Sequence, residues 1–292
     1  MNPLTEIRLI FLREVRKSLR SVKGIILGIL ALLASGVAAL ICIYAEGAAR
    51  DDMGVQDTET FYQLQEKAMA AGGAAPDLAH YMARVPLSLL LFLKFTIWIG
   101  PGLVALLGFD TVASDLQHRA VRYWTVRTRR WTYMVGKFLG LWATVSAVTL
   151  TLNVIAALAV MIKGYISFGA FFTWGLRFWL VSALIASTWS SVAIFISAQF
   201  KTPLLSLLAT FGAFFFLWLP GIVGWVMRLD EAVKTKTHLG DLRWFEYLYP
   251  NGYDDLLLNP HPAKVLTGVG ACIVFMIVFV GGGAALFERR DV

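Results

Sequence analysis

The residues that could carry out chemistry are few in this sequence, and their spacing matches no common catalytic motif. The only Gly-Lys pair is Gly136-Lys137. A phosphate-binding loop needs glycine five positions before that pair, where this chain has Trp131. The four histidines lack the H-E-x-x-H spacing of a zinc helix, and no serine lies in a G-x-S-x-G turn. The sequence therefore predicts that this chain is not an enzyme.

The acidic residues are no better placed to bind a metal ion. Asp254 and Asp255 are adjacent, and adjacent side chains on a helix point about 100° apart, which makes a poor clamp. They are better interpreted as turn and helix-start residues. Asp110 and Asp115 lie five residues apart, a spacing that matches neither a metal site nor a lipid transferase. We therefore expect no metal or other cofactor on this chain.

The most unusual stretch covers residues 115–137, DLQHRAVRYWTVRTRRWTYMVGK. It contains six Lys or Arg, two Trp and two Tyr between apolar segments, a mixture that could bind nucleic acid, a membrane surface or a protein. Residues 115–126 are predicted to form a helix in which Asp115 faces Arg119, four positions on. Buried interface anchors favour Trp and Arg, so we favour a soluble protein partner. An anchor facing lipid headgroups is the simpler alternative, and nucleic acid is the least favoured partner.

The elements that position this stretch are membrane spans. The chain of 292 residues is 58% hydrophobic and only 15% charged, with a mean hydropathy of +0.67, and soluble proteins usually contain about a quarter charged residues. A spanning helix needs about 20 mostly apolar residues, and no segment alternates as a barrel strand does. Six segments qualify: 24–44, 85–109, 138–162, 178–198, 204–225 and 265–287. The predicted fold class is therefore an all-α membrane protein with a single transmembrane domain over residues 24–292.

The distribution of charge predicts the orientation of these spans. With both termini inside, the inner segments carry 15 Lys and Arg and the longer outer segments carry ten, while Lys94 lies within a span. Lys and Arg collect on the cytoplasmic side of membrane proteins. The loop 110–137 is then cytoplasmic, and the loops 45–84 and 226–264 lie outside. The net charge of +7 fits this bias and does not require nucleic acid.

Residues 1–23 are predicted to form an amphipathic helix on the inner membrane surface. Its apolar residues recur every three or four positions, arginines occupy much of the remaining surface, and Asn2 before Pro3 is typical of a helix start. A plain topology anchor is the alternative. In the outer loops, 45–84 is predicted to form a short helical hairpin, whereas YLYPNGYDDLLL indicates turns and short helices near the surface.

Four residues within the spans are candidates for a pathway or a helix interface. Lys94 lies near the middle of the second span, where a charge normally faces a cavity or a partner; snorkelling outward is the alternative. Pro101 in IGPG should kink the same helix. Asn153 is most simply a helix-packing residue. Pro220, followed by Gly221, indicates a break at the end of the fifth span.

The stretch 115–137 resembles the first cytoplasmic loop of type-2 ABC exporter permeases, which are six-span membrane subunits. The family pattern has two acidic residues two places apart, Gly-Thr, a short apolar run, Pro-x-x-Arg, and Gly-Lys at the start of the third span. Aligned on Gly136-Lys137, the first acidic position is Asp115 and the arginine is Arg130. Four further features extend the resemblance over nearly the whole chain: an amphipathic entry helix, a broken fifth span, the segment YLYPNGYDDLLL before span six and the basic tail FERRDV.

The chain departs from this pattern at several positions of the loop. Gln117 stands at the second acidic position, Arg119 and Ala120 replace Gly-Thr, and Arg127 replaces proline. These departures leave the six-span match intact and concern only the contacts of the loop.

The resemblance implies that the loop is a coupling helix seated in a groove of a separate ATPase. Two permease copies (a homodimer, or alternatively a heterodimer) and two ATPase subunits would assemble in the bacterial inner membrane. ATP and Mg²⁺ would bind the ATPase, and substrate would move between the permeases along spans two and five. The residues expected to face the ATPase are Asp115, Gln117, Arg119, Arg122, Trp124, Arg127 and Arg130.

Two alternatives stay open at this stage. An ABC complex could transmit force to a periplasmic or envelope partner through its outer loops without classical transport. A stand-alone secondary transporter would instead need ion-coupling residues inside the membrane, for which Lys94 is nearly the only candidate.

Overall fold

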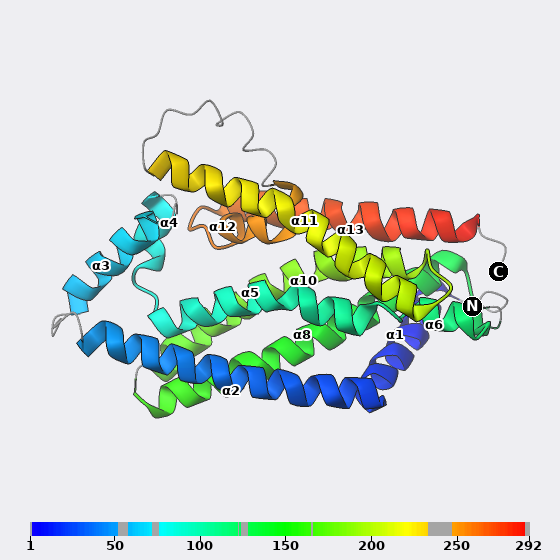
Figure 1. Cartoon of the computed structure of the whole chain (residues 1–292), viewed down its shortest axis with the longest axis horizontal. Coiled ribbons are helices and arrows are strands. Elements are labelled where there is room, and N and C mark those ends of the chain that lie inside the picture. Colours follow the sequence, from blue (N-terminus) through cyan, green and yellow to red (C-terminus); the bar gives the residue numbers. More distant parts are fainter. Residues whose placement is uncertain are drawn as a thin grey trace.

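The computed structural model shows long helices that run side by side along one axis (Figure 1). It describes residues 2–51, 58–71, 76–121, 123, 128–164, 166–232 and 247–289. These residues are almost entirely helical and contain no strand, so the predicted all-α fold class is confirmed.

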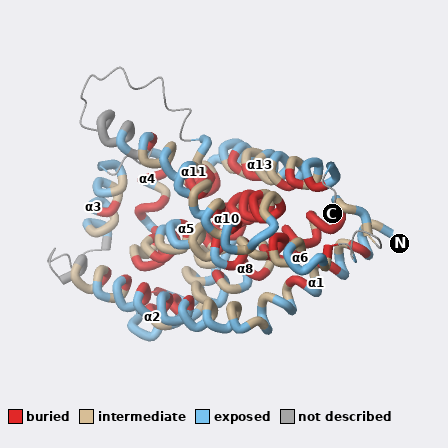
Figure 2. Tube along the Cα trace, turned by 45° about the vertical axis from the view of Figure 1, so that its right-hand side comes forward, coloured by how far each residue is buried: buried red, intermediate tan, exposed pale blue. Residues whose placement is uncertain are grey.

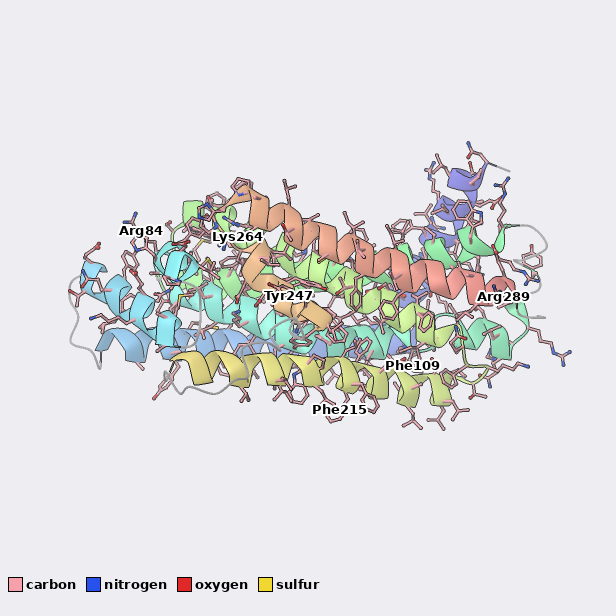
Figure 3. All side chains as sticks on the ribbon, turned by 90° about the horizontal axis from the view of Figure 1, so that it is seen from above. Arg84, Phe109, Phe215, Tyr247, Lys264 and Arg289 are labelled. Carbon is pink, nitrogen blue, oxygen red and sulfur yellow. The ribbon has the colours of Figure 1, made fainter. Side chains whose placement is uncertain are left out.

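Within the described part of the chain, six helices are long and apolar enough to cross a membrane, as the sequence predicts. They are α2 (Val22–Asp51), α5 (Leu87–Gly108), α8 (Arg130–Ile162), α10 (Leu176–Ser197), α11 (Pro203–Ala232) and α13 (Pro262–Glu288). The two ends of the chain lie at one end of the bundle (Figure 1). Arg289 marks this end, which we call the base, and Arg84 marks the opposite end (Figure 3).

The centre of the bundle is α10, which packs against α5, α8 and α13. It is mostly buried, and Figure 2 shows it as the buried core among partly exposed neighbours. Small side chains such as Ser187, Ser190 and Ser191 are fully covered. Small residues let neighbouring helix backbones approach closely in a membrane, which explains why this polar sequence forms the core. A short helix, α9 (Phe168–Ala170), and a π-helical turn, η1 (Phe171–Gly175), lead into α10.

The fifth spanning helix, α11, is the least buried of the six. The expectation that it breaks at Pro220 is wrong, because α11 continues through Pro220 to Ala232. A proline removes a single amide from the helix, and the next residue packs closely against protein. A Cβ atom at Gly221 would lie 2.4 Å from the Tyr249 ring. The glycine therefore allows Tyr249 to lie against the helix at the point where the proline weakens it.

The base is closed by α1 (Pro3–Arg20), which crosses the start of α8. Its N-cap is Asn2, as predicted, and the Asn2 side chain accepts a hydrogen bond from the Leu4 amide at 3.1 Å. The chain turns sharply at Ser21 into α2. A Cβ atom at Gly24 would lie 1.7 Å from the Ser18 carbonyl oxygen, so glycine is required for this corner.

The opposite end carries α3 (Thr58–Ala71) and α4 (Pro76–Met82). Glu46, at the end of α2, is buried and accepts a hydrogen bond from the Ser88 amide in the first turn of α5. A carboxylate stabilises the positive end of a helix in this way. Between α11 and α13, the segment η3 (Pro250–Tyr253) and α12 (Asp254–Leu257) returns into the bundle and contacts α10.

Candidate functional site

Lys137, near the start of α8, is among the most deeply buried charged residues in the described part of the chain. Its side chain is 2% exposed, and its ammonium lies 2.6 Å from the Glu14 carboxylate and 2.8 Å from the Asp115 carboxylate. The ammonium also donates to the Thr111 carbonyl at 2.8 Å. Buried charges are normally paired and hydrogen-bonded in this manner. One lysine thus joins three parts of the base: α1, α8 and the loop that follows α5.

The loop after α5 forms a short helix, α6 (Ala113–Gln117), whose Asp115 is held from several sides. The Tyr133 hydroxyl donates to Asp115 at 2.7 Å, and the Lys17 ammonium lies 3.8 Å from the same side chain. We call Glu14, Asp115, Tyr133 and Lys137 the base cluster. It attaches α6 firmly to α1 and α8.

Two glycines allow α1 to approach α8 closely enough for these contacts. A Cβ atom at Gly136 would lie 2.7 Å from the Ile10 Cβ atom. One turn later, a Cβ atom at Gly140 would lie 2.6 Å from the Glu14 Cβ atom. Such spacing of small residues brings helices together in membranes. The Gly-Lys pair of the sequence therefore has a structural role: Gly136 admits α1, and Lys137 binds it.

A second contact between α1 and α8 involves Glu6, which is buried against the start of α8. Its carboxylate accepts hydrogen bonds from the Thr132 hydroxyl at 2.8 Å and from the Arg129 amide at 3.2 Å. These hydrogen bonds favour the charged form and lower the pKa of Glu6 from its ordinary value. The carboxylate also lies at the N-terminus of α8, where a negative charge is favourable.

The end of α5 is fixed to α10 and α11 by two serines. Ser197 accepts hydrogen bonds from the Val112 and Ala113 amides at 3.0 and 3.1 Å. Ser197 and Ser206 both donate to the Phe109 carbonyl, at 2.8 and 2.5 Å. The turn between α5 and α6 is therefore hydrogen-bonded to two further spans.

The predicted coupling residues fall into two groups in the structure. Asp115 is buried and points into the base cluster, so the expected pair with Arg119 does not form, because α6 ends at Gln117 and Lys137 supplies the partner. Arg119 has a positive φ of 55°, and its side chain and that of Gln117 are exposed. The predicted helix over 115–126 is thus interrupted at its fifth residue.

The remaining predicted docking residues lie elsewhere or outside the described part. Arg130 donates to the Phe287 and Glu288 carbonyls at 3.3 and 2.6 Å and so satisfies the last turn of α13. Arg122, Trp124 and Arg127 lie outside the described residues. Tyr123 is described and is 56% exposed.

A separate polar group, halfway along the bundle, contains two of the residues predicted within spans. Asn251 of η3 donates to the Ile97 carbonyl at 2.9 Å. That carbonyl lies four residues before Pro101 and has therefore lost its helical donor. Asn251 also accepts a hydrogen bond from the Trp189 indole at 2.7 Å. The proline kink of α5 is thus compensated by the segment that re-enters between α11 and α13.

Lys94 lies about one turn before Ile97 on α5. Its ammonium binds the Asp254 carboxylate of α12 at 2.6 Å, and 59% of the Lys94 side chain is exposed. Asn153 donates to the Thr149 carbonyl of its own helix at 2.7 Å, which is an ordinary packing role. Pro220 lies inside α11, as described above. The structure therefore brings Lys94 and Pro101 together around η3 and α12, and it leaves Asn153 apart from them.

Sequence reasoning missed the base cluster as a unit. The available signals were Glu14 on a helix otherwise rich in arginine and a lysine directly after the glycine that opens the third span. The sequence around Asn251, YLYPNGYDDLLL, indicates only turns and short helices. Among the described residues, no three His, Cys, Asp or Glu side chains are grouped so that they could hold a metal ion.

The fold and the site define a multi-pass helical membrane protein whose first loop after the second span is locked to the base of the bundle. The family model for ABC-2 family transporter proteins matches residues 8–292, and the chain belongs to this family. Members of the family are the membrane components of ABC transporters and are not themselves ATPases. No curated protein matches the sequence significantly.

Proposed function

We propose that this chain is the permease subunit of an ATP-driven exporter in the bacterial inner membrane, with both termini in the cytoplasm. It would assemble from two permease copies and two copies of a separate ATPase, which binds ATP and Mg²⁺. The observation that carries this proposal is the base cluster, which fixes α6 to α1 and α8 while leaving Gln117 and Arg119 exposed. An exposed tip on a rigid attachment is what a lever driven by a soluble partner requires.

The hydrogen-bonded contacts of the base suggest how a push on this tip would spread. Lys137 would pass displacement of α6 to α1 and α8, and Ser197 would pass it to α10. Charges and buried polar groups resist separation, because each would be left without its partner. The permease would therefore tilt as a unit between two states when the ATPase dimer closes.

The substrate pathway would lie between the permease copies, beside α5 and α11. The exposed face of α11 is rich in aromatic and aliphatic side chains, including Phe211, Phe215 and Phe216. Figure 3 shows Phe215 on the outer side of the bundle. This surface would meet the second copy or the cargo. The same surface favours an amphipathic or lipid-like cargo.

The test is reconstitution with the ATPase that co-purifies with the chain. We expect substitution of Arg119 and Tyr123 by alanine to reduce ATPase association and ATP-driven transport. The matched control replaces Arg84 and Tyr44, an exposed arginine and tyrosine at the opposite end of the bundle, and should leave both activities unchanged. Equal loss in both double variants, or transport driven by an ion gradient without any ATPase, would overturn the proposal.

A further inference from the structure

A small polar pocket lies at the corner between α1 and α2. Its volume is about 70 Å³, and its lining includes Lys17, Ser18, Ser21 and Lys23. The sharp turn that Gly24 permits brings the side chains of the two helices together here. The pocket therefore brings the Lys17 and Lys23 ammonium groups and the Ser18 hydroxyl together with the Glu14 and Asp110 carboxylates. The Ser21 hydroxyl already donates to the Ser18 carbonyl at 3.1 Å.

A larger apolar cavity of about 290 Å³ lies between α2, α5 and α8. Small residues make this space, among them Ala31, Ala34 and Ala38 on α2 and Gly102 on α5. The hydroxyl of Ser35, which also lines the cavity, donates to the Leu152 carbonyl. The cavity opens on the outer surface of the bundle, since the lining residues Leu30 and Ile99 are 54% and 46% exposed. Its apolar lining is therefore suited to a hydrocarbon chain.

The pocket and the cavity lie on the same faces of two helices. Lys23 lines the pocket and Leu27 lines the cavity, one helical turn apart on α2. Leu107 and Leu103 have the same relationship on α5. From Leu27 to Ala38, α2 rises about 16 Å at about 1.5 Å per residue. This matches one leaflet, since the hydrocarbon core of a bilayer is about 30 Å thick.

The charges around the pocket favour an anionic headgroup. Asp110 binds Lys23 at 2.5 Å, and Glu14 already binds Lys137, so both acids of the pocket are engaged. Lys17 donates to the Ser114 hydroxyl at 3.2 Å, but its nearest carboxylate, that of Asp115, lies 3.8 Å away and its side chain is 40% exposed. Around it, α1 adds exposed arginines such as Arg16 and Arg20. Clusters of Lys and Arg on a helix at the cytoplasmic surface attract anionic lipids.

We propose that this pocket and cavity together bind one anionic phospholipid of the leaflet that faces α1. Its phosphate lies at Lys17 and the Ser18 hydroxyl, and one acyl chain fills the cavity above Lys23. Among the described residues, none of α11 lines the cavity, so the lipid is a resident ligand rather than cargo between the permease copies. The lipid joins α1 and α2 to α5, and it does so whether or not an ATPase binds the loop. The proposed cytoplasmic location of the termini decides only whether this leaflet is the inner or the outer one.

The test uses the full chain, purified with any ATPase that accompanies it and placed in nanodiscs of equal phosphatidylglycerol and phosphatidylcholine with matched acyl chains. Lipid retained after extraction into detergent is identified by native mass spectrometry. We expect about one phosphatidylglycerol per chain, and Ala34→Phe should lower its retention about tenfold, equivalent to about 1.4 kcal/mol, because the ring occupies the mouth of the cavity. Leu33→Phe is the control, since the neighbouring Leu33 is exposed and does not line the cavity.

The headgroup is tested by Lys17→Glu, with Arg16→Glu as a control of equal charge outside the pocket. Lys17→Glu should abolish the preference for phosphatidylglycerol, whereas Arg16→Glu should retain most of it. A monodisperse elution profile establishes that each variant is folded, and the assay requires no transport. Equal retention of both lipids by the unaltered chain, or unchanged retention in both Ala34→Phe and Lys17→Glu, would overturn the proposal.

Discussion

Replacing Lys137 by methionine tests whether the base cluster holds the permease together. The substitution keeps an unbranched side chain in place but removes the ammonium, which lies 2.6 Å from Glu14 and 2.8 Å from Asp115. Both carboxylates are at most 8% exposed. Breaking a buried ion pair from one side typically costs about 3–5 kcal/mol of stability. The Thr111 carbonyl also loses its donor, so we expect a value in the upper part of that range.

The structure further predicts which second substitution restores stability. Asp115 retains the Tyr133 hydroxyl and the nearby Lys17 after Lys137 is lost, whereas the ion pair of Glu14 is with Lys137 itself. Neutralising the less supported carboxylate, by Glu14→Gln, should therefore recover more of the loss than Asp115→Asn does.

The assay is equilibrium unfolding in mixed micelles with increasing dodecyl sulfate, followed by far-ultraviolet circular dichroism. Lys137→Arg is the control that retains the charge. A loss below about 1 kcal/mol, the usual value of an exposed ion pair, would refute the view that this cluster stabilises the base. So would greater recovery by Asp115→Asn.

Three further predictions use the same unfolding assay. Asn251→Leu should destabilise the protein by roughly 1–3 kcal/mol, because the Trp189 indole and the Ile97 carbonyl lose their partner. Pro101→Ala should recover part of that loss by returning an amide to the Ile97 carbonyl, and no recovery would contradict the pairing. Arg119→Gly should stabilise by about 1 kcal/mol, since Arg119 has a φ of 55°, whereas Arg119→Ala should not. The lowered pKa of Glu6 predicts stability that is full above its ordinary value of 4.5 and is lost as pH falls through the lowered value, a dependence that Glu6→Gln should remove.

Features that depend on local composition could be predicted from the sequence. Six apolar segments of spanning length predict six spans because a membrane demands a fixed helix length, whatever the neighbouring helices do. The N-cap at Asn2 could also be predicted, because its side chain bonds the amide of Leu4, only two positions along the chain. These signals lie within one element, and tertiary packing did not override them.

The base cluster could not be predicted because its members are distant in the chain. Glu14 and Lys137 are separated by 123 residues, and their encounter depends on the close approach of two helices at Gly136 and Gly140. The local rule that pairs charges four residues apart suggested Asp115 with Arg119. It failed because a buried ammonium at 2.8 Å offers a stronger partner than an exposed guanidinium.

The two prolines show the same limit. Pro101 and Pro220 both lie inside helices, and the sequence predicted a kink at one and a break at the other. Their local sequences, IGPG and LPGI, do not reveal what compensates them. Asn251 supplies the donor near Pro101, and Tyr249 packs against Gly221 beside Pro220. Both compensating residues come from one re-entrant segment, which only the tertiary structure identifies.

Arg119 connects the strain of the coupling loop with its proposed role. The permeases that this loop resembles have glycine at this position, and the φ of 55° explains that preference, since glycine adopts it without strain. An arginine here costs about 1–2 kcal/mol, and strain of this kind often marks a residue kept for function. Arg119→Gly should accordingly raise stability while weakening ATPase association. A variant that gained stability and bound the ATPase equally well would show that the arginine side chain has no part in docking.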